Sequence, residues 1–260
     1  MPDFYPSSAQ DVIVTRHDYR DGQRFDSHRH ERGQFAYAGC GVITVFTDDG
    51  DWVVPPGRAV WVPADLPHAM CMRGPVTMLN AYVLAETGQR LALAGQCQVL
   101  EVSELLRQLL AQAAEVGSNG SCNERDSYLL GLLLHEMARM PRLALNAPLP
   151  REPRLARICR RLLDQPSLEV AIDDMARDAG MSRRTFTRLF RQHTGVSFVE
   201  WRQQACLLAA VVRLGNGEAV TRVALELGYS SPGAFATVFR RALGASPSRY
   251  FQQDTPYRFS

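Results

Sequence analysis

Apolar residues in the first ~95 positions gather in short runs rich in β-branched and aromatic side chains. Turn signals such as Asp21-Gly22 and Pro55-Pro56-Gly57 separate these runs. The pattern predicts strands at residues 12–15, 34–38, 41–46, 52–54, 59–63 and 76–83. Short strands at regular spacing are typical of an all-β barrel or sandwich. We therefore expect a β-barrel domain over residues 1–95.

The pattern changes to helical spacing in residues 96–142. Val102, Leu105, Leu106, Leu109, Leu110 and Ala113 form one stripe. After a break at residues 117–121, a second stripe contains Tyr128, Leu129, Leu132, Leu133, His135, Glu136 and Met137. Both are amphipathic helices. They could pack on the barrel or on each other, or one apolar face could pair with a second subunit. The three prolines at 148, 150 and 153 predict an interdomain linker over residues 143–153.

A tandem repeat follows, from Ser167 to Phe251. The motif Ala176-x3-Gly180-Met181-Ser182 returns as Ala224-x3-Gly228-Tyr229-Ser230 at an offset of 48 residues. From the phenylalanines Phe186 and Phe235 onward the offset is 49. In each copy a glycine ends a short helix, and a serine is suited to cap the next helix. Two helices joined by such a turn predict a helix-turn-helix.

The composition supports a nucleic-acid partner for this half. Residues 154–260 hold 16 Arg against 9 acidic residues, a net charge of +7, whereas residues 1–153 hold 13 Arg against 18 acids, a net charge of −5. All 29 basic residues are arginine, which supplies fork-shaped donors for phosphate and guanine. The six cysteines form no Cys-x2-Cys pair, and no apolar run reaches ~18 residues. We expect reduced thiols, a cytoplasmic protein, and neither signal peptide nor membrane span.

The run Phe235-x3-Phe239-Arg240-x3-Gly244-x-Ser246-Pro247-x2-Tyr250, with the glycine turn before it, resembles the DNA-binding domain of the AraC/XylS transcriptional regulators. The resemblance covers about the last hundred residues. It implies a seven-helix, double helix-turn-helix domain over residues 154–252, followed by a tail at 253–260. The stretch Ser197–Leu214 suits the long helix that links the two motifs. The resemblance further implies that residues 96–142 form a helical dimerisation segment, and that partners include promoter DNA, a small-molecule effector, a second subunit and RNA polymerase.

The same resemblance assigns DNA contacts residue by residue. Arg184, Thr187 and Arg188 take the outward positions that read base edges, and Arg183 and Arg191 would touch phosphate. The second recognition helix presents Ser231, Pro232, Gly233, Ala236 and Thr237. It offers few donors, so we expect backbone, shape and thymine-methyl contacts there. Arg240 and Arg241 would lie near phosphate.

Histidines mark a candidate site in the predicted barrel. Gly22-x5-His28-x-His30-x3-Gln34-x6-Gly41 and Gly57-x5-Pro63-x-Asp65-x2-His68 resemble the two cupin motifs in spacing, although Gln34 stands where an acidic ligand is usual. His28, His30 and His68 could hold Zn, Ni, Fe or Cu, with Gln34 as a weak fourth ligand. Alternatively they line a metal-free effector pocket, together with Tyr37 and Trp61.

Three classes of function remain. The first is a ligand-responsive transcription factor with no enzymatic activity, which the combination of motifs favours. The second is a metal-dependent cupin enzyme with a DNA-binding tail, against which the missing acidic ligand argues. The third is an architectural DNA protein, which would need no pocket.

Overall fold

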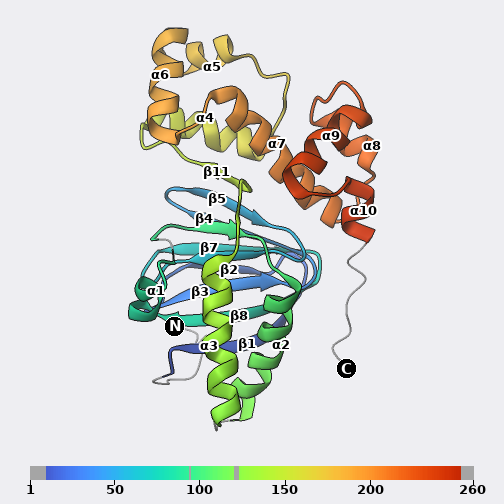
Figure 1. The fold of residues 1–260 in the computed structure, drawn as a ribbon. Helices are drawn as coiled ribbons and strands as arrows, with labels where there is room; N and C mark the ends of the chain where they lie inside the picture. Colours follow the sequence, from blue (N-terminus) through green and yellow to red (C-terminus); the bar gives the residue numbers. More distant parts are fainter. Residues whose placement is uncertain (1–9, 94, 120–122, 253–260) are drawn as a thin grey trace. The chain divides into compact units, whose positions relative to one another are not determined.

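The computed structural model describes residues 10–93, 95–119 and 123–252, and the predicted tail at 253–260 lies outside them. The ribbon of Figure 1 shows strands in the first part of the chain and helices in the last. Two compact units are formed. The first contains residues 10–45 and 54–143, and the second contains residues 46–53 and 144–252. The expected order, a β-rich domain followed by an all-α domain, is confirmed.

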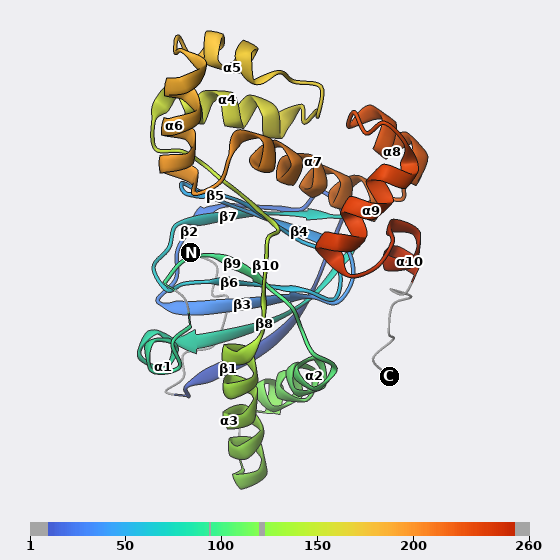
Figure 2. The same ribbon diagram turned by 45° about the horizontal axis from the view of Figure 1, so that its top comes forward.

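The strands form two antiparallel sheets, and all of them except β5, β11 and the end of β4 lie in the first unit. One sheet has the order β1-β8-β3-β6-β9-β10 and the other the order β11-β5-β4-β7-β2. The strands are β1 (Val12–Tyr19), β2 (Arg24–His28), β3 (Arg32–Ala38), β4 (Val42–Thr47), β5 (Gly50–Val54), β6 (Ala59–Val62), β7 (His68–Arg73), β8 (Val76–Leu84), β9 (Gln98–Leu100), β10 (Arg142–Leu143) and β11 (Asn146–Pro148). In Figure 2, β2 and β7 of the second sheet face β3 and β8 of the first. The predicted barrel is thus a two-sheet, cupin-like sandwich.

Helices cover the outer face of the first sheet. A short α1 (Ala85–Arg90) follows β8, and α2 (Glu104–Asn119) and α3 (Glu124–Arg139) form a hairpin. The two helices bury Leu106, Leu110, Leu133 and Met137 against β1, β8 and β3 in one apolar core. The packing of both helices on the sheet and on each other is therefore confirmed.

Two details of the helical prediction need correction. The α2 helix continues to Asn119, through most of the predicted break, while residues 120 and 121 lie outside the described chain. Within the predicted second stripe, Tyr128 and Leu132 are exposed rather than buried. The buried stripe of α3 instead contains Leu130, Leu133, Leu134 and Met137, which have the i, i+3, i+4, i+7 spacing of one helix face.

Seven described helices make up most of the second unit. They are α4 (Pro153–Asp164), α5 (Ile172–Asp178), α6 (Arg183–Thr194), α7 (Phe198–Gly215), α8 (Val220–Glu226), α9 (Pro232–Leu243) and α10 (Pro247–Gln252). The predicted long helix is α7, which begins with a capping box between Ser197 and Glu200. The expected pair of helix-turn-helix motifs, α5–α6 and α8–α9, is confirmed.

The segment predicted as an interdomain linker, residues 143–153, lies almost entirely within the second unit and is packed there. It contains β11, which pairs with β5, and Ala147 there is fully buried. The indole Nε1 of Trp201 in α7 donates a hydrogen bond of 2.8 Å to the backbone carbonyl of Pro148. Residues before α4 are therefore held against the long helix.

Four of the six cysteines are buried: Cys71, Cys97, Cys159 and Cys206. Burial raises the pKa of Cys206 to about 12 and raises the pKa of Cys97 and Cys159 still further. These three thiols therefore stay protonated and act as small apolar side chains. Among the described residues, no helix is both long and apolar enough to cross a bilayer.

Candidate functional sites

The first helix-turn-helix is set by its turn residues and its core. Gly180 has a φ of +64°, the left-handed conformation that lets the chain leave α5. The hydroxyl of Ser182 accepts a hydrogen bond of 3.2 Å from the amide of Thr185, and so caps α6. Phe186 and Phe190 of α6 are fully buried. One face of α6 is thereby fixed inward and the opposite face outward.

All five residues that the sequence placed on the outer face of α6 are exposed: Arg183, Arg184, Thr187, Arg188 and Arg191. Arg183 donates to Asp173 of α5 at 3.0 Å, which ties it to the preceding helix. Within the described chain, Arg184 and Arg188 make no ion pair. Their guanidinium groups are therefore available to a partner.

The outer face of α9 is different. Ser231 caps the helix by accepting from the amide of Ala234 at 3.1 Å, and Pro232 follows at the first helical position. Gly233 and Thr237 are exposed, as are Arg240 and Arg241 in the last turn. The hydroxyl of Thr237 donates to the carbonyl of Gly233 at 3.0 Å. Because that hydroxyl is engaged with the helix backbone, the first turns of α9 present mainly apolar groups.

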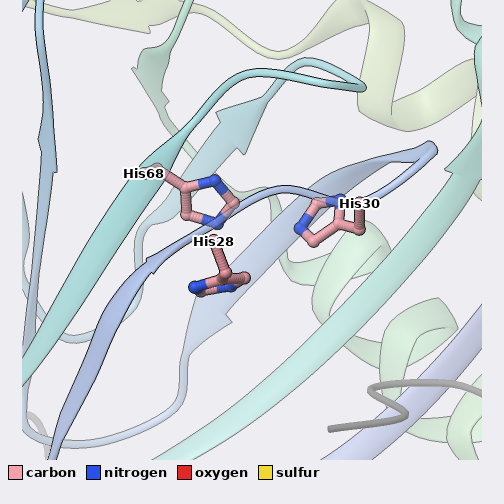
Figure 3. Close-up of side chains that lie close together, drawn as sticks. All are labelled: His28, His30 and His68. Carbon is pink, nitrogen blue, oxygen red and sulfur yellow. The ribbon is translucent and has the colours of Figure 1, made fainter. Parts of the chain in front are cut away.

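In the first unit, three histidines come together from different segments. His28 ends β2, His30 lies between β2 and β3, and His68 begins β7 opposite His28. Figure 3 shows the three rings turned toward one another. The ring centroids of His28 and His68 are 4.4 Å apart, and those of His30 and His68 are 5.0 Å apart. One ligating nitrogen from each ring lies within 4.8 Å of the other two.

Backbone carbonyls fix the orientation of each ring. The Nδ1 atoms of His28, His30 and His68 lie 2.8, 2.5 and 2.8 Å from the carbonyl oxygens of Asp26, Arg32 and Leu66. A carbonyl oxygen only accepts, so each Nδ1 carries the proton. In the neutral rings, each Nε2 therefore holds a lone pair.

Burial keeps two of these rings neutral. Desolvation lowers the pKa of His68 to about 4, with further lowering by His30 and His28, while the Leu66 carbonyl opposes the shift. Desolvation also lowers the pKa of His30. Neutral imidazole is the form that coordinates transition metals.

Gln34 joins the cluster from β3. Its Oε1 lies 3.2 Å from Nε2 of His30, and its Nε2 donates to Oδ1 of Asn80 at 2.8 Å. Tyr82 places its ring edge-on to His30, with centroids 5.7 Å apart. Asn80 and Tyr82 were missed by the sequence analysis, because they belong to a strand more than 40 residues away and carry no motif.

Tyr37 and Trp61 lie elsewhere, and their placement in the histidine pocket was wrong. Tyr37 follows Gln34 by three residues in β3 and so points to the opposite face of the sheet. Trp61 pairs with Phe35, and all three aromatic residues belong to the core under α2 and α3. Trp61 also lines a cavity of about 230 Å³ beside α1, together with Gly33, Leu84 and Gly88.

Both units of the chain match known protein families. Residues 12–134 match the family of AraC-like ligand binding domains, and residues 175–253 match a helix-turn-helix domain family. The HTH-type transcriptional regulator NimR of Escherichia coli K12 is 30% identical over 228 residues, which are 88% of this chain and 82% of that protein. The regulatory protein SoxS of the same organism is 36% identical over 89 residues, which are 34% of this chain and 80% of that protein.

Among solved structures, the DNA-binding domain of AdpA in complex with a target DNA is 34% identical. The match covers 40% of this chain and 94% of that domain, with a TM-score of 0.37. The matched families account for both units, and a regulator is related along most of the chain. The chain therefore belongs to the AraC family of DNA-binding transcriptional regulators with a ligand-binding domain.

Proposed function

We propose that this regulator reads its DNA site chiefly with α6. The supporting observation is the exposure of Arg184 and Arg188 without an ion pair in the described chain, beside an Arg183 that Asp173 restrains. A guanidinium binds O6 and N7 of guanine in two hydrogen bonds, the commonest specific contact in the major groove. Arg183 and Arg191 would position the helix on phosphate. The α9 helix, with Gly233 and Thr237 outward and Arg240 and Arg241 near its end, would contribute shape, phosphate and thymine-methyl contacts.

The test begins with a duplex selected by the full-length protein from a random-sequence pool. Arg184→Ala and Arg188→Ala are each expected to weaken binding to that duplex by about 1–3 kcal/mol, roughly 5- to 150-fold, with selectivity relaxed in one half of the site. Fluorescence anisotropy titrations at several salt concentrations measure the affinity of each variant for the selected duplex and for a random duplex. Arg73→Ala, in the other unit, is the matched control and should bind as the wild type does.

The same titrations examine α9. Replacing thymine by deoxyuridine removes only the 5-methyl group, so the affinity should fall when the exchange is made in the half-site that α9 contacts. If neither arginine variant changes affinity for the selected or for a random duplex, α6 does not read the bases. If affinity does not depend on salt, the DNA-binding account itself fails.

We further propose a homodimer formed through α3. Tyr128 and Leu132 are one turn apart and are 70% and 46% exposed, which gives α3 an apolar outer face. Leu132→Glu is expected to convert a dimer at micromolar concentration into a monomer, as measured by sedimentation velocity. Ala138→Glu, on another exposed face of the same helix, should leave the dimer intact. A wild type that sediments as a monomer would refute the assignment.

Other parts of the proposal follow from the family. We infer a cytoplasmic protein that contacts RNA polymerase at its promoters, with an effector bound in the first unit. We also propose that the chain has no enzymatic activity of its own. Turnover of a substrate by Fe- or Mn-loaded protein, lost in His28→Ala, would contradict that proposal.

A further inference from the structure

We propose that His28, His30 and His68, with Oε1 of Gln34, form a site for one divalent transition-metal ion in the first unit. The proposal does not depend on DNA binding, and it concerns a site separate from the recognition helices. It rests on the grouping of three ring nitrogens with Oε1 of Gln34, and on one buried nitrogen that has no hydrogen-bond partner among the described residues.

The buried nitrogen is Nε2 of His68. This side chain is 1% exposed, and its Nε2 has no hydrogen-bond partner among the described residues. Since Nδ1 donates to the Leu66 carbonyl, Nε2 can only accept. A buried acceptor without a donor costs about 1–3 kcal/mol. A metal ion bound to this lone pair would remove that cost.

The neighbouring atoms offer further lone pairs. Nε2 of His30 and Oε1 of Gln34 lie 3.2 Å apart, and with Nδ1 of His30 protonated both atoms are acceptors. Exchanging the positions of the amide oxygen and nitrogen in Gln34, and in Asn80 with it, would place an N–H donor of Gln34 beside Nε2 of His30. That exchange would not reach Nε2 of His68, so it leaves the buried nitrogen unexplained. A metal ion bound to the lone pairs of the three Nε2 atoms and of Gln34 Oε1 would satisfy these acceptors without that exchange.

The outer contacts are those that metal-binding histidines usually have. A ligating histidine generally donates its other ring N–H to a carbonyl or carboxylate, which fixes the tautomer and the ring orientation. All three rings have this contact, and Asn80 holds the amide of Gln34 in the same way.

The spacing is close to that of a bound set. Two nitrogens on a tetrahedral zinc ion lie about 3.3 Å apart, because each Zn–N bond is about 2.0–2.1 Å. The three ring nitrogens here lie within 4.8 Å of one another. Ring movements of about an ångström would therefore close the set. Imidazole nitrogen with one neutral oxygen favours Zn, Ni, Fe or Cu over Mg or Ca.

The experiment uses the full-length protein without a histidine tag, stripped with a chelator and then dialysed. Titration with Zn²⁺ is expected to give one equivalent bound per chain and to raise the Tm. Titration with Co²⁺ should give the visible absorption bands of a nitrogen-coordinated ion. His28→Ala should weaken Zn²⁺ binding by about 100-fold or more. Removing a residue that only holds a ligand in place would weaken it by roughly 10–100-fold.

Two further variants keep the test decisive. His17→Ala removes a histidine of β1 outside the cluster and should retain full binding. Gln34→Glu places an anionic oxygen at the same position and should tighten Zn²⁺ binding if Oε1 is a ligand. Unchanged affinity in Gln34→Glu would remove Gln34 from the ligand set. Failure of the wild type to bind either ion at one equivalent, or equal binding by His28→Ala, would overturn the site.

Discussion

Replacing Phe190 by alanine is expected to lower the free energy of unfolding of the second unit by about 3–5 kcal/mol. The ring is fully buried. It packs edge-on against Phe198 and Trp201, with centroids 5.5 and 5.9 Å away, and stacks on Phe186 at 5.6 Å. Alanine would leave a cavity that three other rigid rings cannot fill. Denaturant unfolding followed by the fluorescence of Trp201, in a background without the other two tryptophans, measures the loss.

The matched control is Val199→Ala, one residue beyond Phe198 on α7. Val199 is 52% exposed, so its truncation should change the unfolding free energy by less than about 0.5 kcal/mol. Phe190→Ala should also weaken DNA binding, because the same ring holds α6 against α7. A variant as stable as the wild type would show that this aromatic cluster is not the core of the motif.

Gly33→Val is expected to destabilise the first unit by about 3 kcal/mol. A Cβ on Gly33 would overlap the ring of Trp61, meeting Cη2 and lying 2.6 Å from Cζ2. Trp61 is 3% exposed and packed in the core under the helices, so it cannot move aside freely. Overpacking of this kind typically costs about 1–3 kcal/mol, and the rigid indole places this position at the upper end.

Two comparisons isolate that clash. Gly131→Ala, in the middle of α3, has no atom within 4 Å of the new Cβ, and it should stabilise the protein by about 1 kcal/mol through helix propensity. The double variant Gly33→Val/Trp61→Leu should lose less stability than the sum of the two single variants. Strictly additive losses would show that the indole is not what excludes a side chain at position 33.

The second unit was predictable from sequence because its signals are local. Gly180, Ser182 and Phe186 lie within seven residues of one another and set a turn, a cap and a core position without help from the rest of the chain. The same applies to Gly228, Ser231 and Phe235 in the second copy. Here the sequence analysis correctly identified both motifs, the long helix and the exposed face of α6.

The first unit was less predictable because its pairing is long-range. β2 is mostly polar, and β7 contains two methionines, so neither has the β-branched pattern that marks a strand. The apolar pattern marked neither strand, and only the spacing of the histidines indicated that His28 and His68 lie on facing strands, as they do. The same spacing also placed His30 on the strand of His28, whereas it lies beyond the end of β2. Strand alternation could have excluded Tyr37 from the histidine cluster, because it lies an odd number of residues from Gln34. The roles of Asn80 and Tyr82 depend on the β3–β8 register, which no local signal specifies.

The unequal outer faces of α6 and α9 bear on how the promoters of this protein can evolve. If α6 reads bases as proposed, we expect mutations at the bases that it contacts to be selected against, because each would remove a hydrogen bond. At the base pairs that α9 contacts, many base changes would preserve the groove width or a thymine methyl group and would therefore be tolerated. The DNA sites of this protein should then share one conserved half-site beside a variable one.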